Sequence, residues 1–335
     1  MSANLCILGA GSWGTALALQ AARNGFTTVL WGHNHQHIAQ IKLQGENARY
    51  LPGFQFPDNL SVTDNLETAV HESQLVLLAV PSHAFKKTLL DIQPFLAHEH
   101  AVAWATKGFD HDNGALLSDI STSILGESLS TAILSGPTFA LEVAAGLPTA
   151  LTIASKSDQL AGTLTQILHN PTFRTYTSRD LIGVQIGGAC KNVLAIAAGI
   201  ADGLGLGANT RAALITRGLT EIMRLGINLG GQADTFMGLT GLGDLILTCT
   251  DNQSRNRRFG LALGKGDSRE QALESIAQEV EGISAARQAY LLSLQHGVDM
   301  PITEQVFKVL FEDLSPKTAV QNLLMRDQKP EIAVN

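Results

Sequence analysis

The chain has 335 residues and a mass of 35.6 kDa, more than one hydrophobic core usually serves, so two domains are expected. Hydrophobic residues make up 45% of it and charged residues 16%, below the roughly 25% charged of an average soluble chain, and this excludes global disorder. The formal net charge of −7 supplies no general cationic field for a nucleic-acid backbone, so nucleic acid is not expected as a partner.

The cysteine pattern and the N-terminal residues indicate a cytoplasmic location. An odd number of cysteines without a CxxC spacing argues against a disulfide framework or a zinc knuckle and fits a reducing compartment. The first basic residue is Arg23, and Gly9 and Gly11 interrupt the apolar run from Leu5, so no signal peptide is predicted. The cysteines are Cys6, Cys190 and Cys249.

The first half of the chain carries short apolar runs separated by polar segments and turns. Most are apolar throughout, as strands buried on both faces of a parallel sheet should be. Helical patterns such as Thr15–Asn24 lie between several of them, which predicts right-handed βαβ units in a doubly wound, Rossmann-type α/β domain. The predicted strands are Leu5–Leu8, Thr27–Trp31, Leu75–Val80, Ala101–Thr106, Thr131–Leu134, Ala150–Ala154 and Phe173–Thr177.

A GxGxxG pattern directly follows the first predicted strand and opens a helical pattern. Gly9 permits a tight turn, Gly11 lets the backbone approach a pyrophosphate, and Gly14 allows close packing of helix and strand. Ser12 and Trp13 lie between these glycines, where the helix N-terminus faces the anion. The strand before the loop and the second strand after the helix favour a dinucleotide site over a fortuitous glycine turn.

The end of the second predicted strand carries no carboxylate that would bind the ribose of NAD and repel a 2′-phosphate. No acidic residue precedes Glu46. We therefore expect NADP to be tolerated as well as NAD, with His33 beside the adenosine. His33, His35 and His37, like His98 and His100, could also be metal ligands, but no carboxylate or cysteine completes a shell, so we expect a solvated loop and no metal.

After Ser178 the strand signals vanish and long helical patterns rich in alanine, leucine and isoleucine take over. We expect a Rossmann-like dinucleotide-binding domain over residues 1–178 and an all-α domain for substrate binding and catalysis over residues 179–335. The predicted helices are Ile182–Ile200, Arg211–Leu229, Arg269–Gln278, Ser284–His296 and Ile302–Phe311.

The segment Leu181–Ala201 has about the ~20 residues that cross a bilayer and is mostly apolar. Gln185, Lys191 and Asn192 lie near its centre, and a lysine at that depth in lipid is costly. We therefore expect a buried helix of a soluble core and no membrane insertion. An apolar helical domain also favours a homodimer.

Three charged residues in apolar or glycine-rich surroundings are candidates for catalysis. Lys107 ends a predicted strand at the sheet edge where α/β proteins bind ligands, and Lys191 is the only charge in Leu181–Ala201. Burial and a nearby second cation would lower the pKa of Lys191 toward that of a working acid or base. Alternatively Lys107 is a solvated strand-end charge, and Lys191 reaches the surface or pairs with Asp244. Asp244 ends a glycine-rich segment that we expect to be a flexible turn.

Two further segments suit an anionic ligand. Gly136 and Thr138 follow a predicted strand, where a glycine lets a ligand come close to the backbone. Ser254, Arg255 and Asn256 start a helical pattern with a capping serine, an arrangement that suits a phosphate.

The chain resembles the bacterial NAD(P)-dependent glycerol-3-phosphate dehydrogenases over nearly its whole length. The resemblance rests on GAGSWGTALA, ATKGF, SGPTFA, GACKNVLAIAAGI, GLTGLGDLILTC, SRNRRFG and VEG, in family order. It implies cofactor contacts at Ser12, Trp13, His33, Lys107, Ala140, Arg255 and Glu281. It implies substrate contacts at Lys107, Gly136, Thr138, Lys191, Asp244, Ser254, Arg255 and Asn256. His33 departs from members that carry an arginine in the neighbouring segment, which leaves the choice between NAD and NADP open.

The implied reaction is the reversible reduction of dihydroxyacetone phosphate to sn-glycerol 3-phosphate by NADPH or NADH, a supply step for glycerophospholipids. Lys191 would exchange the proton, Lys107 and Asn192 would polarise the oxygens, and Asp244 would orient Lys191. Two rival hypotheses are a dehydrogenase of the same architecture acting on a β-hydroxy or keto acid, and a dinucleotide sensor without turnover. A sensor would have no use for an acid or base.

Overall fold

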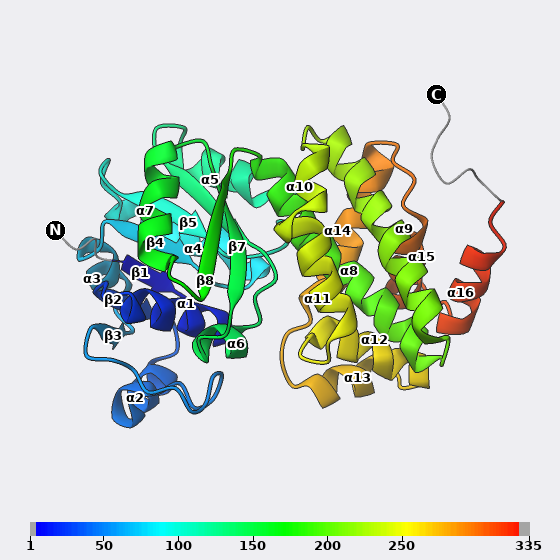
Figure 1. Cartoon of the computed structure of the whole chain (residues 1–335), viewed down its shortest axis with the longest axis horizontal. Helices are drawn as coiled ribbons and strands as arrows, with labels where there is room; N and C mark the ends of the chain where they lie inside the picture. Colours follow the sequence, from blue (N-terminus) through cyan, green and yellow to red (C-terminus); the bar gives the residue numbers. More distant parts are fainter. Residues whose placement is uncertain (1–4, 328–335) are drawn as a thin grey trace.

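The computed structural model describes residues 5–327 and has a sheet part followed by a part built of helices alone. Figure 1 shows the sheet with its helices on the left and the helical domain on the right. The predicted Rossmann-type α/β domain followed by an all-α domain is confirmed. The strands are β1 (Leu5–Leu8), β2 (Thr28–Trp31), β3 (Leu60–Thr63), β4 (Leu75–Leu78), β5 (Ala101–Trp104), β6 (Thr131–Ser135), β7 (Thr149–Ser155) and β8 (Phe173–Ser178).

The eight strands form one sheet in the order β3-β2-β1-β4-β5-β6-β7-β8. All seven predicted strands are present, and β3 was missed because it is a short edge strand whose Ser61 is exposed. The sheet is parallel except at β7, which runs antiparallel to β6. The chain between them contains only the five-residue helix α6 (Ala140–Ala144), and an antiparallel neighbour needs no crossover to the far end of the sheet.

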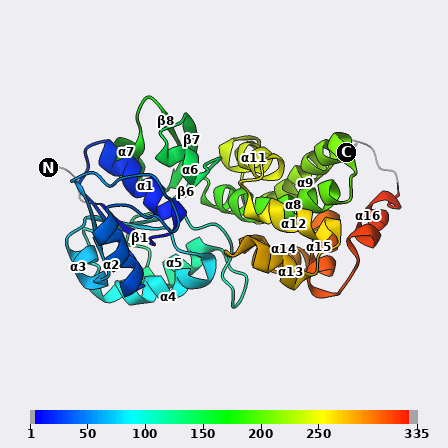
Figure 2. The same cartoon turned by 90° about the horizontal axis from the view of Figure 1, so that it is seen from below.

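Helices cover both faces of the sheet (Figure 2). One face packs against α1 (Ser12–Arg23), α2 (His35–Gln44), α6 and α7 (Asp158–Leu168). The other face packs against α3 (Leu66–His71), α4 (Ser82–Ile92), the short η1 (Gln93–Phe95) and α5 (Leu117–Leu125). The central strands are therefore buried on both sides, which explains their continuous apolar sequences.

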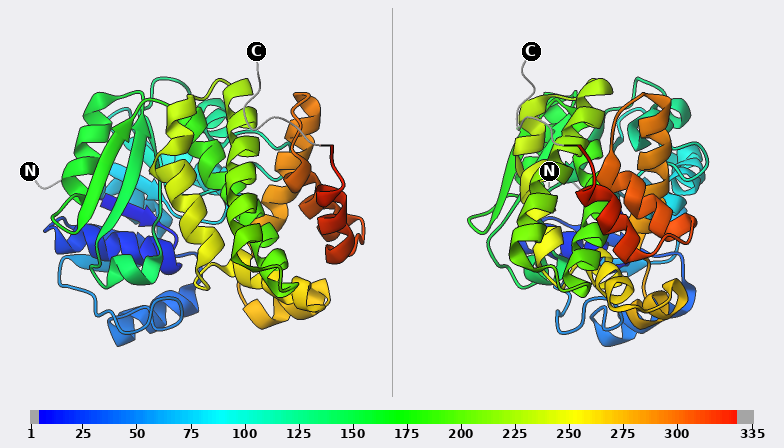
Figure 3. Two further views of the ribbon diagram at one scale, coloured as in Figure 1. Left: turned by 45° about the vertical axis from the view of Figure 1, so that its right-hand side comes forward. Right: turned by 90° about the vertical axis from the view of Figure 1, so that its right-hand side faces the viewer.

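The helical domain is built around α8 (Leu181–Gly203), whose residues from Gly183 to Ala201 are all buried. Among the described residues α8 is the one helix long and apolar enough to cross a membrane, and 89% of its apolar window is buried inside the protein. This matches the predicted core helix. The surrounding elements are α9 (Gly207–Asn228), α10 (Ala233–Met237), η2 (Leu239–Gly243), α11 (Asp244–Thr250), α12 (Arg255–Lys265), α13 (Arg269–Ile276), α14 (Glu281–Gln295), α15 (Pro301–Phe311) and α16 (Pro316–Leu324). Figure 3 shows α16, in red, at the outer side of this domain.

Helices α8 and α12 touch through glycines. A Cβ atom on Gly260 would collide with the carbonyl group of Ile196, and one on Gly199 would collide with that of Arg257. The two backbones approach this closely only because no side chain stands between them. This contact fixes the start of α12 beside the middle of α8.

Two local expectations are wrong. The segment Gly238–Asp244 is not a flexible turn, because η2 is a π-helical turn that runs into α11 and Thr240 anchors it by a hydrogen bond to the Val184 carbonyl at 3.0 Å. The histidine segment is not a solvated loop throughout. Asn34 caps α2 through the N–H of His37, and His37 is buried within the helix.

The boundary between the two domains is a short connection. Strand β8 ends at Ser178 and α8 begins at Leu181, and the buried Asp180 caps α8 by accepting from the N–H of Gly183 at 2.8 Å. We propose that the domains comprise residues 1–178 and 179–335, of which residues 1–4 and 328–335 lie outside the described residues.

The glycine contact predicts opposite effects for two glycine-to-alanine substitutions. Gly260→Ala should lower the free energy of unfolding by about 1–3 kcal/mol, because the added methyl group overpacks the α8–α12 contact. Gly162→Ala is the control: Gly162 is exposed within α7 with no atom near the position of a Cβ, so it should raise the free energy by about 0.5–1 kcal/mol. Urea unfolding followed by circular dichroism measures both. Equal effects of the two substitutions would contradict the close approach of α8 and α12.

Candidate functional site

The glycine loop forms a turn between β1 and α1. Gly9 has a φ of +124°, and a Cβ there would lie 2.6 Å from the carbonyl oxygen of Ala79. A Cβ on Gly14 would collide with the Gly9 carbonyl, whereas one on Gly11 would meet nothing within 4 Å. The backbone is thus packed at the first and third glycines and open at the second. Since α1 begins at Ser12, its free N–H groups face this opening, which fits a pyrophosphate.

A segment from the loop after α2 lies against the glycine loop. The side-chain amide of Asn47 donates to the Ala10 carbonyl at 3.0 Å and to Thr15 Oγ1 at 2.8 Å. The Ser12 hydroxyl donates to the Tyr50 carbonyl at 2.8 Å. These long-range contacts could not be predicted from the sequence, because nothing local marks Asn47 or Tyr50 as neighbours of the loop.

Trp13 and His33 flank the same opening in different ways. The indole Nε1 of Trp13 is buried and has no hydrogen-bond partner among residues 5–327, which leaves a donor for a ligand. His33 is exposed in the connection between β2 and α2. Ala140, a predicted cofactor contact, begins α6, which packs beside α1.

A buried aspartate joins two lysines from different parts of the fold. Lys107 follows β5, Lys191 lies in the middle of α8, and Asp244 begins α11. Lys107 Nζ donates to Asp244 Oδ2 at 2.7 Å, and Lys191 Nζ donates to Asp244 Oδ1. The Asp244 side chain is 1% exposed and that of Lys191 9%, so the lysine does not reach the surface. The carboxylate bridges the sheet domain and the helical domain.

The protonation of Lys191 is set by competing effects. Burial lowers the pKa of Lys191 to about 8, the charge of Asp244 acts to raise it, and the ammonium group of Lys107 lowers it further. A single carboxylate cannot neutralise two ammonium groups, so the cluster favours the loss of one proton. Lys191 is therefore a group that can exchange a proton near neutral pH.

Two further oxygens hold the lysines, and one of them comes from a residue that sequence reasoning missed. Thr248 Oγ1 lies 3.0 Å from Lys191 Nζ and donates to the Asp244 carbonyl at 2.6 Å. Thr248 lies four residues after Asp244, so a helix predicted over this segment would have placed the two side chains on the same face. The Gly136 carbonyl accepts from Lys107 Nζ at 3.2 Å and from Thr138 Oγ1 at 3.1 Å, so the lysine also touches the segment after β6.

The predicted capping serine is present at the start of α12. Ser254 Oγ accepts from the N–H of Arg257 at 3.2 Å. The Arg257 guanidinium is buried, with an ion pair to Asp202 at 2.5 Å and a hydrogen bond to the Cys249 carbonyl at 3.0 Å. Arg257 therefore stabilises the fold, whereas Arg255 is exposed at the first position of the helix.

Asparagine side chains connect α12 to α8 and α14. The Asn256 amide nitrogen donates to Asn192 Oδ1 at 2.9 Å, and Asn256 Oδ1 accepts from the N–H of Gly282 at 2.9 Å. Both asparagines are buried. Asn192 thus lies beside Lys191 on α8 with its oxygen already occupied, and its amide nitrogen is the group it can offer to a ligand.

Glu281 begins α14 at the edge of the same cluster. Burial raises the pKa of the Glu281 carboxyl, and the positive charges of Arg255, Lys107 and Lys191 act in the opposite direction. One region therefore holds the candidate residues that lie on or follow β5, β6, α8, α11, α12 and α14. The glycine loop and His33 lie apart from it, at the ends of β1 and β2.

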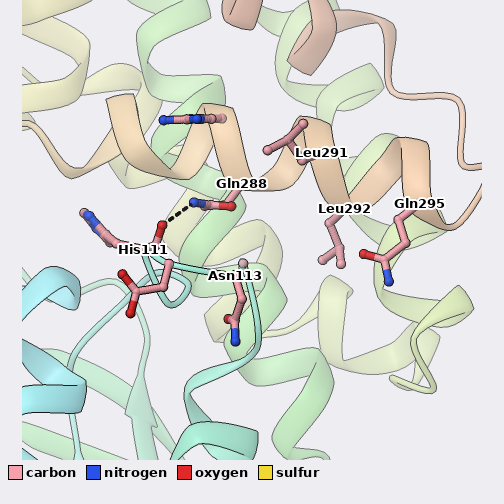
Figure 4. Close-up of a pocket in the computed structure, with 9 residues that line it drawn as sticks. His111, Asn113, Gln288, Leu291, Leu292 and Gln295 are labelled. Carbon is pink, nitrogen blue, oxygen red and sulfur yellow. Dashed lines mark hydrogen bonds between the residues drawn. The ribbon is translucent and has the colours of Figure 1, made fainter.

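A cavity of about 150 Å³ lies elsewhere, between the loop that follows β5 and helix α14. In Figure 4, Gln288 donates to the carbonyl of His111 across it, at a distance of 3.0 Å. None of the residues that line it belongs to the lysine cluster. Beside Lys107 there is a second, much smaller space of about 10 Å³, which Ser135 and Gln185 also line.

Solved structures share this architecture. A glycerol-3-phosphate dehydrogenase from Coxiella burnetii superposes with a TM-score of 0.94 at 47% identity, over 97% of this chain and 99% of that one. One from Saccharomyces cerevisiae has a TM-score of 0.83 at 25% identity, over 96% of this chain and 99% of that one. A ketopantoate reductase from Ralstonia eutropha, at 18% identity and a TM-score of 0.59 over 95% of this chain and 99% of that one, shares the fold alone.

Sequence comparison covers both domains. Residues 4–161 match the family model described as NAD-dependent glycerol-3-phosphate dehydrogenase N-terminus, and residues 180–321 match the model of the C-terminus. A protein of Methylococcus capsulatus named glycerol-3-phosphate dehydrogenase (NAD(P)+) is 57% identical over 328 residues, which span 98% of this chain and 98% of the relative. Both halves of the chain match one family in full order, and the chain therefore belongs to the NAD-dependent glycerol-3-phosphate dehydrogenases.

Proposed function

We propose that the chain catalyses the reversible reduction of dihydroxyacetone phosphate to sn-glycerol 3-phosphate with Lys191 as the proton donor and acceptor. The observation that carries the proposal is the buried Asp244 held between Lys107 and Lys191 beside the start of α12. As a family member the chain is an NAD(P)-dependent oxidoreductase, and its relatives' names support this substrate. Oxidation of NADPH followed at 340 nm with dihydroxyacetone phosphate tests it directly.

Lys191 exchanges the proton of the reaction. The nicotinamide cofactor, when bound, supplies or takes up the hydride at C2 of the substrate. During reduction Lys191 Nζ gives a proton to the C2 oxygen as negative charge develops there, and during oxidation it takes the proton from the hydroxyl group. Asp244 and Thr248 hold the amine in place, because they accept from Nζ on one side and leave another N–H for the substrate.

Lys107 and Asn192 polarise the substrate oxygens. The ammonium group of Lys107 is largely buried, where a positive charge acts through a lower dielectric than in water. The Asn192 oxygen accepts from Asn256, which turns the Asn192 amide N–H groups toward the other side as donors. These positions are fixed before the substrate arrives, so stabilising the developing charge requires little reorganisation.

The start of α12 binds the phosphate. Ser254, Arg255 and Asn256 present a hydroxyl, a guanidinium and an amide at a helix N-terminus, whose free N–H groups favour an anion. We assign Gly136 and Thr138 to the same phosphate site, and Lys107 Nζ donates to the Gly136 carbonyl there. The phosphate is thus held apart from the carbon that reacts, and this contact positions C2 near Lys191.

The cofactor lies between the glycine loop and this cluster. The proposed pyrophosphate contacts are the open backbone of the glycine loop and the first turn of α1. We assign the adenosine side to His33 and the nicotinamide side to the residues around the lysine cluster. The full set of cofactor residues is Gly9, Gly11, Ser12, Trp13, Gly14, His33, Lys107, Ala140, Arg255 and Glu281.

The cellular setting is also part of the proposal. The described cysteines are free and buried, which supports a reducing cytoplasm. Ile227, Met237 and Ile246 are large apolar side chains exposed on the helical domain, which supports a homodimer. In that setting the product would supply glycerophospholipid synthesis.

Removing the acid should slow the chemical step. We expect Lys191→Ala to lower kcat by at least ~10² because no other group replaces the proton donor, with little change in NADPH binding. The control is Lys265→Ala, since Lys265 is exposed in the last turn of α12. Steady-state kinetics and fluorescence titration of NADPH measure the two effects. Near-normal turnover of Lys191→Ala would remove Lys191 from the mechanism.

The pKa of Lys191, lowered to about 8, predicts opposite pH profiles for the two directions. Reduction needs the protonated amine, so its kcat should fall as pH rises through about 8. Oxidation needs the neutral amine, so its kcat should rise over the same range. Initial rates between pH 6 and 10, roughly two units on either side, measure both. Profiles that bend in the same sense would exclude one group acting in both directions.

Phosphate recognition should depend on Arg255. Arg255→Ala should reduce kcat/KM for dihydroxyacetone phosphate. The lost transition-state stabilisation should be about 1.5–3 kcal/mol, the range for hydrogen bonds to charged groups, and both kcat and KM should change. Dihydroxyacetone should be a very poor substrate of the wild type, and Arg255→Ala should discriminate less between the two ketones. Arg258→Ala, which removes an exposed arginine one turn along, serves as the control. Full phosphate preference in Arg255→Ala would mean that the phosphate is bound elsewhere.

A further inference from the structure

Arg49 is held at the mouth of the dinucleotide site by the residues on either side of it. On one side the Asn47 amide donates to the Ala10 carbonyl and to Thr15 Oγ1. On the other side the Tyr50 carbonyl accepts from the Ser12 hydroxyl at 2.8 Å. Three hydrogen bonds to the glycine loop and the first turn of α1 therefore anchor the residues on either side of Arg49, although its own side chain is exposed.

The guanidinium of Arg49 stacks on the ring of Tyr50, which in turn contacts His37. Its central carbon lies 5.1 Å from the centre of the Tyr50 ring, and that ring meets His37 edge to face at a centroid distance of 5.2 Å. His37 lies in the first turn of α2, just after the end of β2. Burial lowers the pKa of His37, and the charges of Arg49 and His33 add to this effect. Arg49 and His33 therefore both lie close to His37, at the end of β2.

Two carboxylates in the neighbouring segments, Glu46 and Asp64, have other partners. Glu46 accepts from the N–H of Gly53 and from the Gln55 amide, each at 3.2 Å. Asp64 follows β3, the neighbour of β2, and pairs with His35 at 2.6 Å. Asp64 has no local sequence signal for this position, because only the pairing of β2 with β3 brings it beside α2.

We propose that Arg49, stacked on Tyr50 near the end of β2, binds the 2′-phosphate of NADP and sets the preference for NADP over NAD. The inference rests on the proposed function, because it assigns a residue to the cofactor of that reaction. In this fold the adenosine ribose lies at the end of the second strand, where an arginine accommodates a 2′-phosphate. A guanidinium forms paired hydrogen bonds to a phosphate, and its stacking on Tyr50 reduces the conformational entropy that binding would cost.

A binding experiment separates the 2′-phosphate from the rest of the cofactor. Isothermal titration calorimetry would compare adenosine 2′,5′-bisphosphate with 5′-AMP on the wild type, on Arg49→Ala and on Lys42→Ala. Lys42 is an exposed cation in the last turn of α2, so its removal tests for a general effect of charge. Arg49→Ala should weaken binding of the bisphosphate at least ~10-fold and that of 5′-AMP less than ~3-fold, as expected for a lost charged contact. Lys42→Ala should change neither by more than ~3-fold, because exposed charges are screened.

Kinetics and stability complete the test. In Arg49→Ala the KM for NADPH should rise more than the KM for NADH, and Arg49→Lys should recover part of the difference. Thermal melting should show that Arg49→Ala is folded. Equal weakening of both nucleotides, or a wild type that does not prefer the bisphosphate to 5′-AMP, would overturn the inference. Failure of the proposed function would look different: dihydroxyacetone phosphate would not be reduced with either cofactor, although the nucleotides still bound.

Discussion

The structure depends on one carboxylate shared by two ammonium groups. Asp244 accepts from Lys107, at the end of a sheet strand, and from Lys191, in the core helix of the other domain. A buried ammonium without a partner is strongly unfavourable, so this bridge allows two cations to remain in the interior. Burial lowers the pKa of Lys191 to about 8, the charge of Asp244 opposes this shift, and the ammonium group of Lys107 adds to it. The interaction that joins the domains thus also acts on the protonation of Lys191.

Packing of the helical domain places the remaining groups around this bridge. Glycines bring α12 against α8, so the asparagine after Lys191 meets Asn256 and the start of α12 faces the lysines. The π-helical turn η2 is hydrogen-bonded to α8, and it leads directly into Asp244 at the start of α11. In the proposed mechanism, backbone contacts therefore fix the separations between the groups assigned to the phosphate, the reacting carbon and the proton, and rigid positioning of this kind is a main source of catalysis.

The sequence predicted the parts of the site that have a local signature. A strand, three glycines and a helix start identify the dinucleotide loop, and Lys191 stands out as a lone charge in an apolar helix. Contacts between distant segments have no such signature. Asn47 and Tyr50 cover the glycine loop, Asp64 reaches α2 across the sheet, and Thr248 lies on a short helix without a clear pattern. The sequence alone also does not distinguish the arginines that follow Ser254. The structure shows that Arg257 is bound to Asp202, whereas Arg255 is exposed.

The central claim is that Asp244 and Lys107 set the charge of Lys191 in opposite directions. Nuclear magnetic resonance of protein labelled at the lysine side chains can follow the titration of Lys191 directly, with Lys191→Arg assigning the signal. The wild-type pKa should be about 8. Asp244→Asn should lower the pKa of Lys191 further, because the attracting charge is lost, and Lys107→Met should raise it, because the repelling charge is lost. A pKa of Lys191 that stays unchanged in both variants, or that rises in Asp244→Asn, would contradict the account.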